Sequence, residues 1–200
     1  MAKIDETVIN NSGFNQGVLV ANNSGNINIT YNKTKITPSL IARIVKVIAN
    51  VCCDENYNSD SSDDLLVYKP DEKLEYNKVI KYKYIFEELS TYYSHCHSIL
   101  NEYDDFNLDS KSKILKCIHL WYLEEKGNLL LSLKNNNDRT DIEKILDNAD
   151  LLIDKIKARI LEAVKNNNDI DAFCLEDMEL GTTCFVCYCF IECKILEKPI

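Results

Sequence analysis

The sequence lacks the short motifs that mark many nucleotide-binding proteins and hydrolases. It contains no G-x-x-x-x-G-K-[ST] loop, no G-x-G-x-x-G loop, no G-x-S-x-G turn and no H-E-x-x-H pair. These motifs supply phosphate-binding loops, activated serines and zinc ligands, so their absence argues against those classes of enzyme. The sequence therefore predicts a non-enzymatic protein with no catalytic residue and no cofactor.

Positive charge is also scarce. The chain has 23 lysines and arginines against 32 aspartates and glutamates, which gives a net charge of −9, and no stretch gathers the basic residues into a cluster. Nucleic-acid backbones and anionic membranes attract basic surfaces. The composition therefore argues against nucleic acid as a direct partner and against a membrane.

A secretion signal and a membrane-spanning run are missing as well. The opening residues, MAKIDETVINNSG, have no apolar segment of the kind that a signal peptide needs. We therefore expect a cytoplasmic protein in which the nine cysteines are reduced thiols. An odd number of cysteines also fits poorly with a complete set of disulfides.

The most apolar stretch is Leu180–Leu196, LGTTCFVCYCFIECKIL, which carries no charge from Cys184 to Ile191. It is shorter than the run of about 20 apolar residues that crosses a bilayer. A helix that is apolar all round must otherwise lie inside a core. We interpret this stretch as the buried central helix of a helical domain.

Four cysteines of this stretch, Cys184, Cys187, Cys189 and Cys193, have a spacing that resembles metal-ligand motifs. At about 100° per helical residue, the first two lie about 60° apart and the last two about 40° apart, and the two pairs point to nearly opposite sides. One ion cannot reach all four sulfurs. We interpret them as small buried hydrophobic residues and predict no metal site, with a two-sulfur half-site completed from elsewhere as the alternative.

The remaining candidates for chemistry are His95, Cys96 and His97, followed by Cys117 and His119. On a helix the two neighbouring histidines lie roughly 200° apart, so they cannot chelate one ion together. A cysteine nucleophile needs a base beside it in space, which spacing alone does not establish. An enzyme that uses these groups is the least favoured reading.

Residues 1–32 contain a repeat in which VINNSG, from Val8, recurs as VANNSG, from Val20. The Asn-Asn-Ser-Gly segments are typical of turns, and short β-type runs lie between them. We predict a small β-meander or β-arch that packs as a hairpin, stays disordered until a partner arrives, or pairs with copies of itself. The candidate self-association residues are the apolar ones of these runs: Val8, Ile9, Val18, Val20, Ile27 and Ile29.

Helical periodicity and capping signals predict five helices in the rest of the chain. Thr37-Pro38 and Thr140-Asp141-Ile142-Glu143 are start signals of the N-cap and capping-box kinds. The predicted helices span 37–52, 70–100, 110–133, 140–163 and a last one from about 175.

The predicted helix from Pro70 places Leu74, Val79, Ile80, Ile85 and Leu89 on its inner face. It also carries Tyr76, Tyr82 and Tyr84. Tyrosines gathered on one helix are typical of a protein-binding face, and these three are candidate partner-binding residues. The alternative is that they lie half-buried where helices meet.

Three stretches together resemble a known family: LEYNKVIKYKYIFEEL from Leu74, KILKCIHLWYLEEKG from Lys113, and CFVCYCFIECKILEKP from Cys184. The resemblance is to the C-terminal helical domain of bacterial ABC-type three-component systems, which are predicted anti-phage conflict systems. It implies that the helical part mediates assembly, with an ABC-type ATPase and a small middle component as partners. The effector domain that this family carries at its N-terminus is replaced here by the Asn/Gly-rich repeat.

These observations predict a mainly α protein in which a helical bundle surrounds a buried C-terminal helix and a small N-terminal β element precedes it. The predicted domains are a β-repeat segment, 1–35, and a helical domain, 36–200, with a mobile acidic loop at 54–64. The leading hypothesis is a non-enzymatic assembly component of a bacterial defence system, homo-oligomeric through its N-terminal strands. The alternative is a sensor of a small ligand or nucleotide whose helical cleft controls the oligomeric state.

Overall fold

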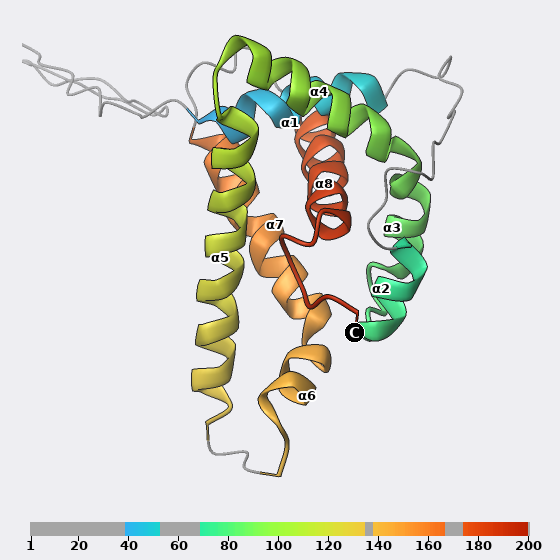
Figure 1. Ribbon diagram of the computed structural model, residues 1–200, viewed down its shortest axis with the longest axis vertical. Coiled ribbons are helices and arrows are strands. Elements are labelled where there is room, and N and C mark those ends of the chain that lie inside the picture. Colours follow the sequence, from blue (N-terminus) through green and yellow to red (C-terminus); the bar gives the residue numbers. More distant parts are fainter. Residues whose placement is uncertain (1–38, 53–68, 135–137, 167–173, 200) are drawn as a thin grey trace, which may run out of the picture. The chain divides into compact units, whose positions relative to one another are not determined.

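The computed structural model describes residues 39–52, 69–134, 138–166 and 174–199 (Figure 1). The chain divides after Lys35 into two units, and all of the described residues belong to the second. These residues are mainly helical and include no strand. The predicted β-repeat, the start signal at Thr37-Pro38 and the acidic loop at 54–64 all lie outside the described residues.

Helix α8, Leu175–Ile191, lies at the centre of the unit (Figure 1). Helix α1, Leu40–Cys52, crosses it, and α7, Ala149–Lys165, packs beside it. From Cys184 onward every residue of α8 is buried. The prediction of an apolar central helix is confirmed.

The crossing of α1 and α8 depends on a glycine. A Cβ atom at Gly181 would lie 2.4 Å from the backbone oxygen of Val45 and 3.0 Å from the Cβ of Ala49. The two helix backbones therefore approach more closely than any other residue type at this position would allow.

The single helix predicted for 70–100 is wrong. The structure has α2, Pro70–Tyr76, then a turn, followed by α3, Lys83–Leu89, the 3₁₀ turn η2, Ser90–Tyr92, and α4, Tyr93–Phe106.

The turn between α2 and α3 forms because a carboxylate from elsewhere satisfies its backbone. Lys78 adopts a left-handed conformation with φ 53°. The Asp150 carboxylate of α7 then accepts hydrogen bonds from the N–H groups of Ile80 and Lys81, at 3.0 and 3.1 Å. Ile80, predicted to face inward, is 80% exposed as a consequence.

The helix predicted for 140–163 is also divided. The capping box is confirmed, since the Thr140 side chain accepts from the N–H of Glu143 and the Glu143 carboxylate accepts from the N–H of Thr140. It opens only the short α6, Asp141–Leu146, and the chain bends before α7 begins. The unit therefore has more and shorter helices than the five predicted.

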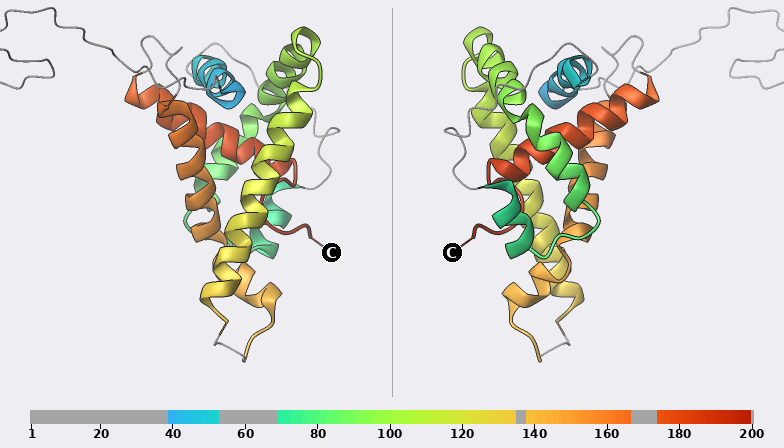
Figure 2. Two further views of the ribbon diagram at one scale, coloured as in Figure 1. Left: turned by 90° about the vertical axis from the view of Figure 1, so that its left-hand side faces the viewer. Right: turned by 90° about the vertical axis from the view of Figure 1, so that its right-hand side faces the viewer.

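Helix α5, Ser110–Ser132, is the longest described helix and runs unbroken past Gly127. It packs against α7 and α4 and lies along an edge of the unit (Figure 1). Figure 2 shows α5 and α7 converging toward α6. One side of α5 therefore faces the core while the other faces away from the remaining helices.

No described helix combines the length and the hydropathy that a membrane crossing requires.

Candidate functional site

The segment after α8, Glu192–Pro199, folds back across α2 and α5. We call it the tail. Cys193 and Leu196 adopt left-handed conformations, with φ 53° and 60°, that turn its path. The side-chain amide of Asn77 bonds both backbone groups of Glu197, each at 2.9 Å. The tail is thereby fixed as part of the helical unit.

Helix α5 holds the tail from its other side. The carbonyl oxygen of Lys194 lies 2.9 Å from Nδ1 of His119, and the ring nitrogen donates because a carbonyl can only accept. The hydroxyl of Tyr122 donates to the Glu197 carboxylate at 2.6 Å, and Lys126 pairs with the same oxygen. Burial would raise the pKa of Glu197, but the contacts with Lys126 and Tyr122 outweigh it and lower that pKa.

A buried lysine joins α2 to the end of α8. Lys73 is 1% exposed, and its ammonium group donates to the carbonyl oxygens of Phe190 and Ile195. It also lies 4.3 Å from the centre of the Phe190 ring. Burial lowers the pKa of Lys73 to about 8. A cation at this position complements the negative end of the α8 dipole.

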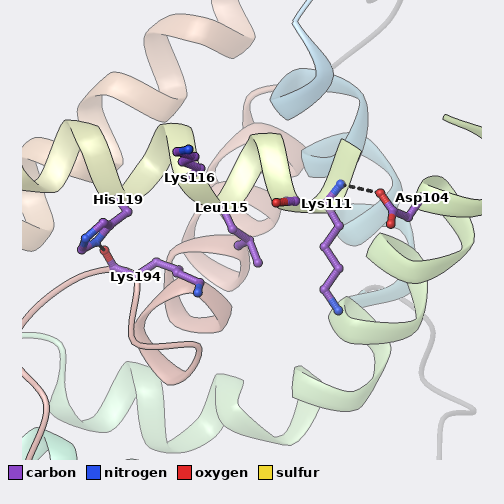
Figure 3. Close-up of a pocket in the computed structure, with 7 residues that line it drawn as sticks. Asp104, Lys111, Leu115, Lys116, His119 and Lys194 are labelled. Atoms are coloured by element: carbon purple, nitrogen blue, oxygen red, sulfur yellow. Dashed lines mark hydrogen bonds between the residues drawn. The ribbon is translucent and has the colours of Figure 1, made fainter. Parts of the chain in front are cut away.

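The tail, α4 and α5 border an open pocket of about 430 Å³ (Figure 3). Its size falls in the range of sites for small ligands. The side chains of Lys111, Leu115 and Lys194 point to the same side of α5. We call this the basic pocket, and its lining residues are Asp104, Lys111, Ser112, Leu115, Lys116, His119 and Lys194.

Three ammonium groups and one carboxylate line the basic pocket. The carboxylate, that of Asp104, accepts the backbone N–H of Lys111 at 2.9 Å. The Lys111 ammonium group donates to the side-chain oxygen of Asn101 at 2.7 Å. No described residue pairs with the ammonium groups of Lys116 or Lys194. The wall is therefore locally positive in a chain whose net charge is −9.

A polar cluster lies beside this pocket. The Tyr93 hydroxyl donates to the Glu192 carboxylate at 2.8 Å, and the same oxygen lies 3.6 Å from Nδ1 of His97. Burial, followed by the bond to Glu192, raises the pKa of Tyr93, so this hydroxyl stays protonated. Nε2 of the same His97 lies 3.5 Å from the Lys111 ammonium group.

The structure separates the histidines and cysteines that the sequence offered as candidates for chemistry. His119 lines the basic pocket, His97 lies beside it, and Cys117 lines a different hollow with Trp121. Among the described residues, no three or more His, Cys, Asp or Glu side chains gather in a group that could hold a metal ion.

The cysteines of α8 pack as the sequence predicts, with one correction. Cys184, Cys187 and Cys189 are buried. Cys193 lies beyond the last helical residue, because α8 ends at Ile191. The angle of about 40° between Cys189 and Cys193, which assumes a continuous helix, therefore does not apply.

The buried thiols are protonated. Burial is the main cause that raises the pKa of Cys187 and of Cys189 well above 9.0. The sulfur of Cys184 lies 3.3 Å from that of Cys52 and 3.7 Å from that of Cys96. The contact with Cys52 lowers the pKa of Cys184, but the contact with Cys96 and burial together raise it by more.

The three candidate partner-binding tyrosines do not share a face. Tyr82 is 3% exposed and its hydroxyl donates to Asp154 at 2.5 Å, so the prediction for Tyr82 is corrected: it belongs to the core. Tyr76 is half-buried, whereas Tyr84 is exposed. At about 100° per residue, a continuous helix would also spread the three tyrosines around its axis.

An apolar surface that was not predicted from the sequence lies on the outer side of α5. Leu120, Leu123 and Leu131 are 56%, 45% and 71% exposed. Their spacing places them in one row along the helix. Gly127 lies in the same row, and a Cβ atom there would meet nothing within 4 Å. We call these four residues the α5 stripe.

Charged residues surround the α5 stripe. Lys116 and Lys134, one near each end, are exposed. Glu124 is paired with Arg159 of α7 at 2.8 Å. The rim of the stripe is therefore basic at both ends.

Comparison of the chain with protein-family models, with curated proteins and with solved structures finds no match.

Proposed function

We propose that the chain is a non-enzymatic interaction component of a bacterial defence system, and that the α5 stripe is the surface on which its partner docks. The observation that carries this proposal is a row of three exposed leucines around a glycine on the longest described helix. The family resemblance, which assigns an assembly role to the helical domain, supports it independently.

Gly127 indicates the kind of partner. A glycine inside an exposed helix costs roughly 1 kcal/mol relative to alanine. No described neighbour lies within 4 Å of the place that a Cβ atom would take, so no close contact within the unit requires a glycine here. A second helix crossing here would gain close backbone contact and bury the leucines on both sides. The partner surface is therefore a helix with a narrow apolar face.

The charges around the stripe indicate which helix fits. The ammonium groups of Lys116 and Lys134 favour acidic residues at both ends of the partner's apolar face. A second copy of this chain would place basic rims opposite one another, which disfavours pairing through this surface. The partner helix consequently belongs to a different protein.

Replacing Leu123 by glutamate tests this proposal. The chain is co-expressed with the proteins encoded beside it, where the resemblance places an ABC-type ATPase and a small middle component. The mass of the purified complex is measured by light scattering and its affinity by titration. Burying a carboxylate at the centre of the stripe is expected to weaken binding by about 30-fold or more, the effect of losing an interface hot spot.

Leu151→Glu is the matched control. Leu151 is 44% exposed against 45% for Leu123, and it also lies on a long helix, α7. The control is expected to bind as the unchanged chain does. Equal binding by both variants, or no complex with any of these proteins, would contradict the proposal.

Self-association through residues 1–35 remains a prediction from the sequence. Its test is the double substitution Ile27→Asp with Ile29→Asp in the full chain, measured by light scattering. If these side chains face a second copy, charging them is expected to reduce the native mass to that of a monomer. The control, Asn26→Asp with Asn28→Asp, adds the same charge at the alternate strand positions and is expected to leave the mass unchanged. The prediction is wrong if both variants keep the same mass.

A further inference from the structure

Beyond protein docking, we infer that the basic pocket binds a small molecule that carries a phosphate group. Three ammonium groups, from Lys111, Lys116 and Lys194, line one cavity of about 430 Å³ together with the hydroxyl-bearing Ser112. These are the donor types that bind phosphate oxygens in proteins.

The fold brings the side chains of Lys111 and Lys194 to the same side of α5. Lys111 and Lys116 both belong to α5, where the five positions between them correspond to about 140° around the helix axis. Lys194 comes from the tail, which His119 fixes through the Lys194 carbonyl. Burial is the main cause that lowers the pKa of Lys111. Glu192 and Asp104 raise this pKa, and the repulsion from Lys194 is smaller than the attraction of either carboxylate.

The carboxylates of Asp104 and Glu192 lie near these ammonium groups and keep their negative charge, since their hydrogen-bond donors are neutral. Asp104 accepts the backbone N–H of Lys111, and Glu192 accepts the hydroxyl of Tyr93. Because Lys116 and Lys194 have no partner among the described residues, their ammonium groups are available to a ligand. In Figure 3 the Lys194 and Lys111 side chains extend on the same side of α5, to which Leu115 also points.

The size of the pocket limits the class of ligand further. Leu115 lines the pocket but is only 6% exposed, so it offers a ligand little apolar surface. A free phosphate ion would leave most of the cavity volume unused. A phosphate ester, such as a mononucleotide, fills more of it. The site therefore accommodates a phosphate monoester better than an inorganic ion.

The experiment is calorimetric titration of the full chain with adenosine monophosphate, adenosine and inorganic phosphate. Adenosine monophosphate is expected to bind more tightly than either of the others, and to raise the melting temperature. Equal binding of adenosine would show that the phosphate group contributes nothing, and it would overturn the inference. So would the absence of binding by both phosphate compounds.

Substitutions locate the site. Lys194→Gln removes a cation that has no described partner, and it is expected to weaken adenosine monophosphate binding about tenfold, the loss of one charge-assisted contact. Lys116→Gln serves as a second variant, with an effect of the same direction. The control, Lys134→Gln, removes the same charge at the far end of α5 and is expected to change binding less than about twofold. Equal weakening by Lys194→Gln and Lys134→Gln would indicate general attraction to the surface and would overturn the assignment to this pocket.

Discussion

Replacing Gly181 by alanine is expected to destabilise the helical unit by about 2–4 kcal/mol, although the same change stabilises most helices. In a helix interior, glycine to alanine normally gains roughly 0.5–1 kcal/mol because alanine loses less backbone entropy on folding. At Gly181 the added methyl group would lie 2.4 Å from the backbone oxygen of Val45 and 3.2 Å from a methyl carbon of the same residue. Backbone cannot rotate away as a side chain can, so α1 must move off α8 and open the core that they share.

The measurement is urea unfolding of the full chain, followed by circular dichroism. Gly127→Ala is the matched control, since Gly127 is also helical and its added methyl group would meet nothing within 4 Å. The control is expected to be more stable than the unchanged chain by about 0.5–1 kcal/mol. If the two variants shift the unfolding midpoint in the same direction, the close crossing of α1 and α8 is wrong.

Above pH 9 the unit is expected to lose stability steeply. Cys187 and Cys189 have pKa values raised mainly by burial, and Cys184 is raised as well by its contact with Cys96 and by burial. The unfolded chain therefore releases protons from these thiols near pH 9.0 that the folded chain keeps, and the raised pKa values of Cys52 and Cys117 act in the same direction. Because the folded state then binds more protons than the unfolded state, the free energy of unfolding falls as the pH rises.

Lys73 has the opposite effect on the free energy of unfolding as the pH rises. Its pKa is about 8 in the folded chain against a reference value of 10.5, so between these values the unfolded chain holds one proton more. Between pH 8 and 10.5 Lys73 therefore offsets part of the loss that the thiols cause. The free energy of unfolding is expected to fall more steeply from pH 9 to 10 than from pH 8 to 9.

This loss is measured by urea unfolding at pH 8, 9 and 10 with a reducing agent present, so that thiols do not oxidise. Lys73→Met removes the opposing proton, and its stability is expected to fall more steeply with pH. Cys187→Ala removes one thiol, and its curve is expected to be shallower. A free energy of unfolding that stays constant from pH 8 to 10 would contradict the burial of these thiols.

The sequence predicted the features that depend on local composition. The uncharged run from Cys184 to Ile191 could be accommodated only in a core, and the structure places it there. The Thr140–Glu143 capping box also formed where its four residues predicted it.

The features that the sequence did not predict depend on residues far apart in the chain. The turn after α2 is stabilised by Asp150, some 70 residues away from the N–H group that it binds at Ile80. The basic pocket needs Lys194 of the tail beside Lys111 and Lys116 of α5, and no spacing rule joins them.

The α5 stripe did leave a signal in the sequence. The buried residues of α5 include Ile114, Ile118 and Tyr122, whereas Leu120, Leu123 and Leu131 fall on the opposite side. A helix that is apolar on two sides, yet lies at the edge of its unit, has one apolar side that the unit does not cover. The sequence could not show which side that was before the packing of α5 was known.

Site-specific photo-crosslinking in cells tests the central claim most directly. A photoreactive phenylalanine analogue is placed at Leu123 in one variant and at Leu151, which is equally exposed, in another. If α5 carries the docking surface, irradiation is expected to crosslink the first variant to a protein encoded beside this chain and to leave the second without that product. A crosslink to the same protein from both positions, or from Leu151 alone, would show that the partner does not dock on α5.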